Sequence, residues 1–210
     1  MRVATAISRI ALVAALAVMG SAVHAQQTKT LEAGVTKVAL STGFVSALED
    51  LGLRAGMVGP TQLRDGVVNF PLTGGAVDLD TAKAQILHSG GLTLAPASSP
   101  ESAEPTVRLE SFIIDTTGSA PVITGLVIVK GALIGRVPLF NLQLPAGIKL
   151  PLKTQDGQLV LDGVGVTLTS TAAHTLNSVF NVTTLKGDFH IGTAKVRACT
   201  GDEDEYEGWR

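Results

Sequence analysis

Residues 107–144 read VRLESFIIDTTGSAPVITGLVIVKGALIGRVPLFNLQL and decide the fold class. They contain three apolar runs rich in valine, leucine and isoleucine, which predict strands at Val107–Asp115, Val122–Val129 and Arg136–Leu144. The breaks between the runs are short and contain glycine or proline, as turns between antiparallel strands do. This stretch therefore predicts three consecutive antiparallel strands.

The same pattern of short apolar runs and turn residues extends over residues 26–198. Many short strands at close spacing are typical of an all-β domain. The sequence therefore predicts a mainly β fold, an antiparallel β-sandwich or two-sheet domain. Further strands are expected at Val67–Leu72, Ala84–His88, Leu92–Ala95, Leu159–Leu168 and Leu185–Arg197.

Two segments depart from the period of two and predict short α-helices. In Ser41–Leu51, Phe44 and Leu48 fall on one helical face, and a serine or threonine at the start can cap the helix. Thr169–Phe180 has the same organisation, with a threonine or serine cap and one apolar face. We expect both helices to be stable only when packed on the sheet.

The first 25 residues have the organisation of a cleavable secretory signal peptide. Arg2 and Arg9 precede an apolar run at Ile10–Met19. Val23–Ala25 then supplies small residues at the cleavage position. An apolar run of this length is too short to span a bilayer. We therefore expect Met1–Ala25 to be removed and the chain to be exported, to a periplasm or to the outside of the cell.

The charge of the mature chain argues against nucleic acid as a partner. Loss of Arg2 and Arg9 from 16 basic residues leaves 14, against 18 acidic residues, which is a formal charge of −4. A mildly acidic chain does not attract a phosphate backbone. A second apolar stretch of spanning length does not occur in the sequence, so we expect no transmembrane segment in the mature chain.

The composition predicts a single folded domain over residues 26–199, followed by an acidic disordered tail at residues 200–210. Cys199 is the one cysteine of the chain, so an intrachain disulfide cannot form. The fold must then be stabilised by burial of apolar side chains, for which a domain of this length is large enough.

The usual sequence signatures of enzymes and metal sites are missing. The sequence has no glycine-rich phosphate loop and no GxSxG, HExxH or CxxC motif. Asp78 and Asp80 lack the further oxygen ligands that a calcium loop needs. The sequence therefore predicts a protein that is neither an enzyme nor a metal-binding protein.

Among the histidines, His88 is the one of most interest. It ends an apolar strand and is followed by Ser89-Gly90-Gly91, a turn in which backbone donors are exposed. Both a structural role and a ligand-contacting role remain open for it. The other mature histidines, His174 and His190, are expected to face solvent because they fall on the polar sides of their helix and strand.

Several short segments resemble the secreted HtaA-like domain family. They are FPLTGG at residues 70–75, ILHSGGL at 86–92, VRLESF at 107–112, LFNL at 139–142 and VTLT at 166–169. The resemblance spans roughly residues 29–197. It implies a β-rich domain with one helix near the start and a second near the end.

The resemblance also implies a ligand. Characterised members bind heme in bacterial iron acquisition, with a tyrosine from the first helix on the iron and a histidine from a later turn supporting it. His88 matches the histidine, but the first helix carries Phe44 and Leu48, and the one tyrosine of the chain is Tyr206 in the tail. Heme is therefore a candidate cofactor whose tyrosine ligand is missing.

These observations lead to two hypotheses about function. The first is an exported, non-enzymatic binding domain of HtaA-like type, whose ligand is an unidentified small apolar molecule. Its site is expected in a cleft between the sheet and the first helix, with Phe44, His88 and Ser89 as contacting residues. The alternative is a structural or cell-surface interaction domain without a small-molecule ligand.

Overall fold

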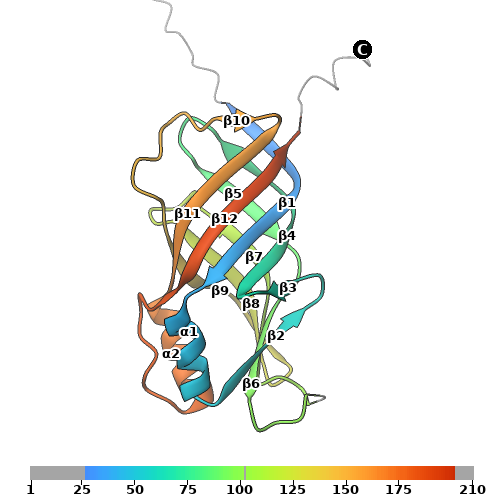
Figure 1. The fold of residues 1–210 in the computed structure, drawn as a ribbon, viewed down its shortest axis with the longest axis vertical. Helices are drawn as coiled ribbons and strands as arrows, with labels where there is room; N and C mark the ends of the chain where they lie inside the picture. The colour runs from blue at the N-terminus through green and yellow to red at the C-terminus, as the bar shows by residue number, and fades with distance from the viewer. Residues whose placement is uncertain (1–26, 102, 202–210) are drawn as a thin grey trace, which may run out of the picture.

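The structure is a computed structural model that describes residues 27–101 and 103–201. The predicted signal peptide and residues 202–210 of the predicted tail lie outside these residues. The described part of the chain is one antiparallel sheet with two short helices at one end (Figure 1).

Eight antiparallel strands in the described residues close into a barrel. The pairing of the first strand with the last joins the two halves of the chain, with Val35 opposite Arg197 and Leu40 opposite Gly192. The order around the barrel is β7 (Val107–Asp115), β5 (Ala84–His88), β4 (Val67–Asp78), β1 (Thr28–Leu40), β12 (His190–Thr200), β11 (Gln158–Leu168), β9 (Ala132–Gln143) and β8 (Val122–Val129), which pairs back with β7.

The mainly β prediction is confirmed, whereas the predicted sandwich or two-sheet arrangement is wrong. Strands with one buried face alternate apolar and polar residues in a barrel and in a sandwich alike. The difference depends on long-range pairing, here that of β1 with β12, which local patterns do not reveal.

A two-stranded wing extends from the barrel at the end where the helices lie. It consists of β6 (Gly91–Pro96) and β2 (Leu53–Val58), and we call it the β2–β6 wing. Strand β7 changes partner along its length, from β6 at its start to β5 at its end. The change occurs at Ser111, which has a positive φ of 54° and donates its N–H to the carbonyl of Gly90. Two minor strands, β3 (Gln62–Arg64) and β10 (Thr154–Gln155), pair with β4 and β11.

Both predicted helices are present, as α1 (Thr42–Asp50) and α2 (Ser170–Phe180). Ser41 caps α1 by accepting the N–H of Phe44, and its hydroxyl also donates to the carbonyl of His190. Thr169 caps α2 in the same way and donates to the carbonyl of Pro138. The caps thus tie both helices to neighbouring strands at one end of the barrel (Figure 1).

Besides the minor strands β3 and β10, strands β1 and β2 were not expected from the sequence. Strand β1 carries charged and glycine positions between its apolar residues, and Gly34 lies so close to β12 that a Cβ there would be 2.1 Å from the carbonyl oxygen of Arg197. Strand β2 is short and pairs with β6 alone in the described residues. Both strands are defined by their pairing with a neighbouring strand and not by an alternation of apolar and polar residues in their own sequence.

The barrel interior is tightly packed at the end remote from the helices. Leu31, Ile86 and Leu159 are each less than 2% exposed there, and a space lined by Ile86 and Leu159 measures only about 30 Å³. Neither of the two described helices, of 9 and 11 residues, is long and apolar enough to cross a membrane. The core is less complete at the helical end, where the site lies.

Candidate functional site

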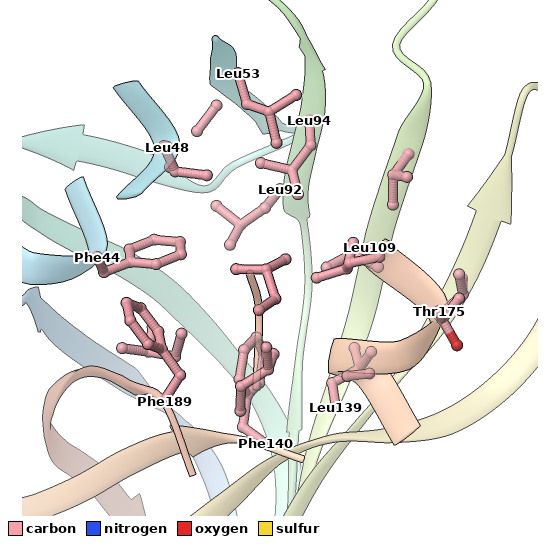
Figure 2. A pocket seen from close by; sticks show the side chains of 18 of the residues that line it. Phe44, Leu48, Leu53, Leu92, Leu94, Leu109, Leu139, Phe140, Thr175 and Phe189 are labelled. Carbon is pink, nitrogen blue, oxygen red and sulfur yellow. The ribbon is translucent and has the colours of Figure 1, made fainter. Parts of the chain in front are cut away.

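An apolar cavity lies between the two helices, the β2–β6 wing and the nearby end of the barrel. Its space is about 90 Å³, and we call it the outer chamber. Thr175 is the sole polar side chain that lines it among the described residues, and its hydroxyl donates to the carbonyl of Thr171 within α2. Figure 2 shows side chains from several elements around this space. The residues that line the outer chamber include Phe44, Leu48, Leu92, Phe140, Leu176 and Phe189.

The helices rest on this chamber and not on a filled core. Helix α1 has no fully buried residue, and Phe44 and Leu48 on its inner face are only half-buried. On α2, Ala172 and Ala173 are buried against the barrel, while Leu176 is half-buried at the chamber. Large apolar side chains on an inner face are normally covered completely in a packed core. Here they border an unfilled space.

A second space, the inner chamber, adjoins the outer one and lies farther inside the barrel. It measures about 70 Å³. Thr36 and His88 are its polar lining residues within the described chain, and Phe70 and Phe112 meet edge to face on its wall with ring centroids 5.3 Å apart. The two chambers share a common border formed by Leu40, Phe44, Val68, Leu92, Phe140 and Ile191.

His88 is buried inside the barrel, with 6% of its surface exposed. It is the last residue of β5, and its Nε2 lies 2.7 Å from Oγ1 of Thr36 on β1, so the ring reaches past the intervening strand β4. Its Nδ1 is buried, and the backbone carbonyls of Phe112 and Ile86 lie within hydrogen-bond range of the ring. Burial lowers the pKa of His88 from 6.5 to about 4, against the smaller, opposite influence of the carbonyls of Phe112 and Ile86. The imidazole is therefore neutral near pH 7.

The other residues predicted for the site lie in different surroundings. Phe44 lines both chambers, as expected of a contacting residue. Ser89 lines neither chamber, and its backbone N–H donates to the carbonyl of Pro71. His174 and His190 are exposed, in agreement with their predicted orientation.

Much of the cavity wall was not predicted from the sequence. The cleft was expected between the sheet and the first helix, but α2 and the β2–β6 wing form a large part of the wall. The apolar face of α2 was visible in the sequence as a packing surface, and it could have indicated this contribution. Thr36 could not have been found, because it meets His88 across 52 residues of chain.

The structure assigns structural roles to the acidic residues that were considered for calcium. Asp78 is 5% exposed, and its Oδ1 accepts the backbone N–H groups of Asp80 and Thr81 in a tight turn. Within the described residues, no three histidine, cysteine, aspartate or glutamate side chains are grouped in a way that could hold a metal ion.

Heme does not fit the residues of this cavity. Phe44 and Leu48 occupy the inner face of α1, where the resemblance placed a tyrosine, and Tyr206 lies outside the described residues. A hydrocarbon side chain cannot donate an oxygen ligand to ferric iron. In addition, no charged side chain among the described residues lines either chamber, so the two heme carboxylates would have no basic partner there.

Comparison with known proteins gives similarity in structure but not in sequence. No protein family model matches the chain, and no curated protein is similar to it in sequence. The C-terminal domain of HtaA from Corynebacterium glutamicum matches with a TM-score of 0.61 and 12% identity, over 82% of this chain and 99% of that domain. The N-terminal domain of the same protein matches with a TM-score of 0.60 and 9% identity, with the same coverage of both chains.

A third similar structure is the heme-binding protein HtaB of the same organism, with a TM-score of 0.52 and 9% identity. That match covers 84% of this chain and 96% of HtaB. At these identities the similarity concerns the fold, and the resemblance seen in the short sequence segments is confirmed at that level. The chain is therefore a distant HtaA-like domain in its fold.

Proposed function

We propose that this chain is an exported, non-enzymatic binding domain that holds an apolar small molecule in its two adjoining chambers. The observation that carries the proposal is the pair of adjoining apolar spaces between the helices and the barrel, which are bordered by half-buried phenylalanine and leucine side chains. Ligand pockets in proteins are typically apolar hollows with a few polar groups.

The free energy of burial supports a ligand of this kind. Complete burial of a leucine or phenylalanine side chain contributes about 1.5–3 kcal/mol. Phe44, Leu48 and Leu176 gain only part of this in the unliganded protein, because each is half-buried. A ligand that fills the chambers would cover the remainder. An apolar cavity of roughly 150 Å³ is known to admit a molecule as large as benzene, and the chambers of about 90 and 70 Å³ are of that order.

Two further features support the non-enzymatic and exported parts of the proposal. The polar residues of the chambers are Thr36, His88 and Thr175, and none of them forms a pair of nucleophile and activating base with an orienting third group. The organisation of residues 1–25 as a signal peptide supports export.

The test is binding of a hydrophobic fluorescent probe, Nile red, to the wild type and to two tryptophan variants of α1. Leu48→Trp places an indole in the outer chamber and is expected to weaken probe binding about tenfold or more. Val45→Trp is the matched control, because Val45 is 40% exposed on the same helix and does not line the cavity. It should leave binding unchanged.

A hemin titration of the wild type completes this test. The missing oxygen ligand leads us to expect no saturable shift of the Soret band. Equal Nile red binding by the wild type and Leu48→Trp would contradict the proposed site, and a saturable, stoichiometric Soret shift would restore heme as a ligand.

The alternative, a cell-surface interaction domain, is favoured by one surface feature. Leu133 and Ile134, at the turn between β8 and β9, are 65% and 60% exposed. Adjacent, highly exposed apolar side chains often mark an interaction surface. If Nile red does not bind, and the double variant Leu133→Glu with Ile134→Glu abolishes attachment of the protein to cells that retain the wild type, this function replaces the binding of a small molecule.

A further inference from the structure

The wall of the barrel divides in two at its helical end. Farther from the helices, β5 joins β4 to β7 by pairing with residues 72–77 of the one and residues 113–115 of the other. Past His88, where β5 ends, β3 pairs with residues 67–69 of β4, while β6 pairs with residues 107–110 of β7. The facing strands of the two parts are β3 and β2, and within the described chain neither pairs with a further strand. A slit therefore separates β3 from the β2–β6 wing.

The slit has three sides, formed by β2, β3 and α1. The strands meet in the turn at Thr61, which is 4% exposed and lies so close to Gly90 that a Cβ on that glycine would be 2.2 Å from Oγ1 of the threonine. Helix α1 closes the opposite side. The N–H of Leu40 before the helix donates to the carbonyl of Gly66 after β3, and Gly52 joins the other end of the helix to β2. Figure 1 shows α1, β2 and β3 around this region.

The outer chamber reaches solvent at this slit. Among the described residues that line the chamber, Ala55 on β2 and Leu63 on β3 are exposed, and all the others are buried or half-buried. Leu63 is 45% exposed. A side chain that lines a chamber and also faces solvent marks a place where the chamber opens. The strand pairing and the exposure of side chains thus locate the same opening independently.

We infer that the slit between β2, β3 and α1 is the mouth through which the apolar ligand enters and leaves the outer chamber, and that Leu63 controls the rate of its passage. The inference rests on the proposed function, since it assigns an entrance to the same cavity. Strand β3 suits this role because its three residues are all exposed and it pairs with β4 alone in the described chain. Such a segment can open locally without disturbing the packed core.

The test obstructs the mouth after the protein has folded. The native Cys199 is exposed, so Cys199→Ser is the background for all variants. Leu63→Cys is labelled with a stilbene disulfonate maleimide, a rigid group whose two charges keep it out of the apolar chamber. Val160→Cys is the matched control, because Val160 is a 38% exposed apolar residue on β11 that lines neither chamber. Stopped-flow fluorescence gives the association and dissociation rates of Nile red before and after labelling.

We expect the label on Leu63→Cys to slow both association and dissociation about tenfold or more, because a group at the mouth obstructs passage in both directions. The Kd, which is the ratio of the two rates, should change by no more than about twofold, because the bound probe lies deeper in the chamber. The label on Val160→Cys should change neither rate. Each protein is compared with itself before labelling, so any effect of the substitution on folding does not enter the comparison.

The outcomes separate this inference from the proposed function. If Nile red binds and the label on Leu63→Cys leaves both rates unchanged, the ligand enters elsewhere, and the inference is refuted while the site stands. Weaker binding through faster dissociation would show that Leu63 is part of the binding wall and not of an entrance. Equal slowing by the label on Val160→Cys would also refute the assigned mouth. If the wild type does not bind Nile red at all, the proposed function itself is wrong.

Discussion

His88 is the residue that links the stability of this fold to pH. Its pKa is lowered from 6.5 to about 4 by burial, so between these values the unfolded chain binds a proton that the folded chain does not. The free energy of unfolding must then fall as the pH falls through this window, by about 3 kcal/mol in total. Stability is fully retained above pH 6.5.

Urea unfolding of the wild type and of His88→Leu, at about pH 7 and about pH 4.5, measures this effect. We expect the wild type to lose about 2–3 kcal/mol more than the variant, which lacks the titrating group. Carboxylates that titrate at lower pH affect both proteins equally, so the difference between the two isolates His88. Parallel losses in the two proteins would show that the imidazole is not buried in the neutral form.

Among the individual residues of the site, the sequence predicted some and could not predict others. Phe44 was found because helical periodicity assigns it to an inner face. Strand alternation suggested no partner for His88, and the hydrogen bond to Thr36 exists only because β1, β4 and β5 become neighbours in the barrel. Ser89 was predicted to contact a ligand because it lies in a glycine-containing turn. It follows His88 directly in the chain, but it does not line the cavity.

At the scale of elements, attachment of the β2–β6 wing depends on a glycine. A Cβ at Gly91 would lie 2.0 Å from the carbonyl oxygen of Leu109 and 2.7 Å from Cα of Glu110, both on β7. We expect Gly91→Ala to lower the free energy of unfolding by about 2–3 kcal/mol, because backbone atoms must move apart. It should also weaken Nile red binding, since Leu92 and Leu94 of the wing line the outer chamber.

The control for this substitution is Gly43→Ala in α1, where a Cβ would meet nothing within 4 Å. Alanine in a helix is favoured over glycine, so a gain of about 0.5–1 kcal/mol is expected. Urea unfolding measures both variants. An unchanged stability in Gly91→Ala would mean that β6 does not pair closely with β7.

The elements themselves were predicted where local signals are strong. The caps were predicted to within one residue, as Ser41 or Thr42 and as Thr169 or Ser170, because a hydroxyl side chain before an amphipathic run is a local signal of a helix start; the structure selects Ser41 and Thr169. Strands β7 and β8 were recognised with their full bounds, because their side chains alternate or are continuously apolar. Strand β1 was missed and the barrel was mistaken for a sandwich for one reason: both depend on the pairing of β1 with β12, which lies far from β1 in the sequence.

In the molecule as a whole, the two ends of the barrel differ in how completely their side chains are packed. The end remote from the helices is filled by side chains such as Leu31, Ile86 and Leu159, whose burial stabilises the fold. The helical end leaves Phe44, Leu48 and Leu176 half-covered around the chambers. A stable closed sheet thus supports an end whose packing the proposed ligand would complete.

This division predicts a difference in local stability that amide hydrogen exchange can measure. In the unliganded protein, amides of α1 and of the β2–β6 wing should exchange faster than those of β4 and β12, because local opening is easiest where few side chains are buried. A bound ligand such as Nile red stabilises only the conformation that binds it, by about 2.7 kcal/mol at a concentration of about 100 times its Kd. Protection should therefore increase at α1, α2 and the wing. An equal increase over the entire barrel would instead show that the helical end opens only when the whole molecule unfolds.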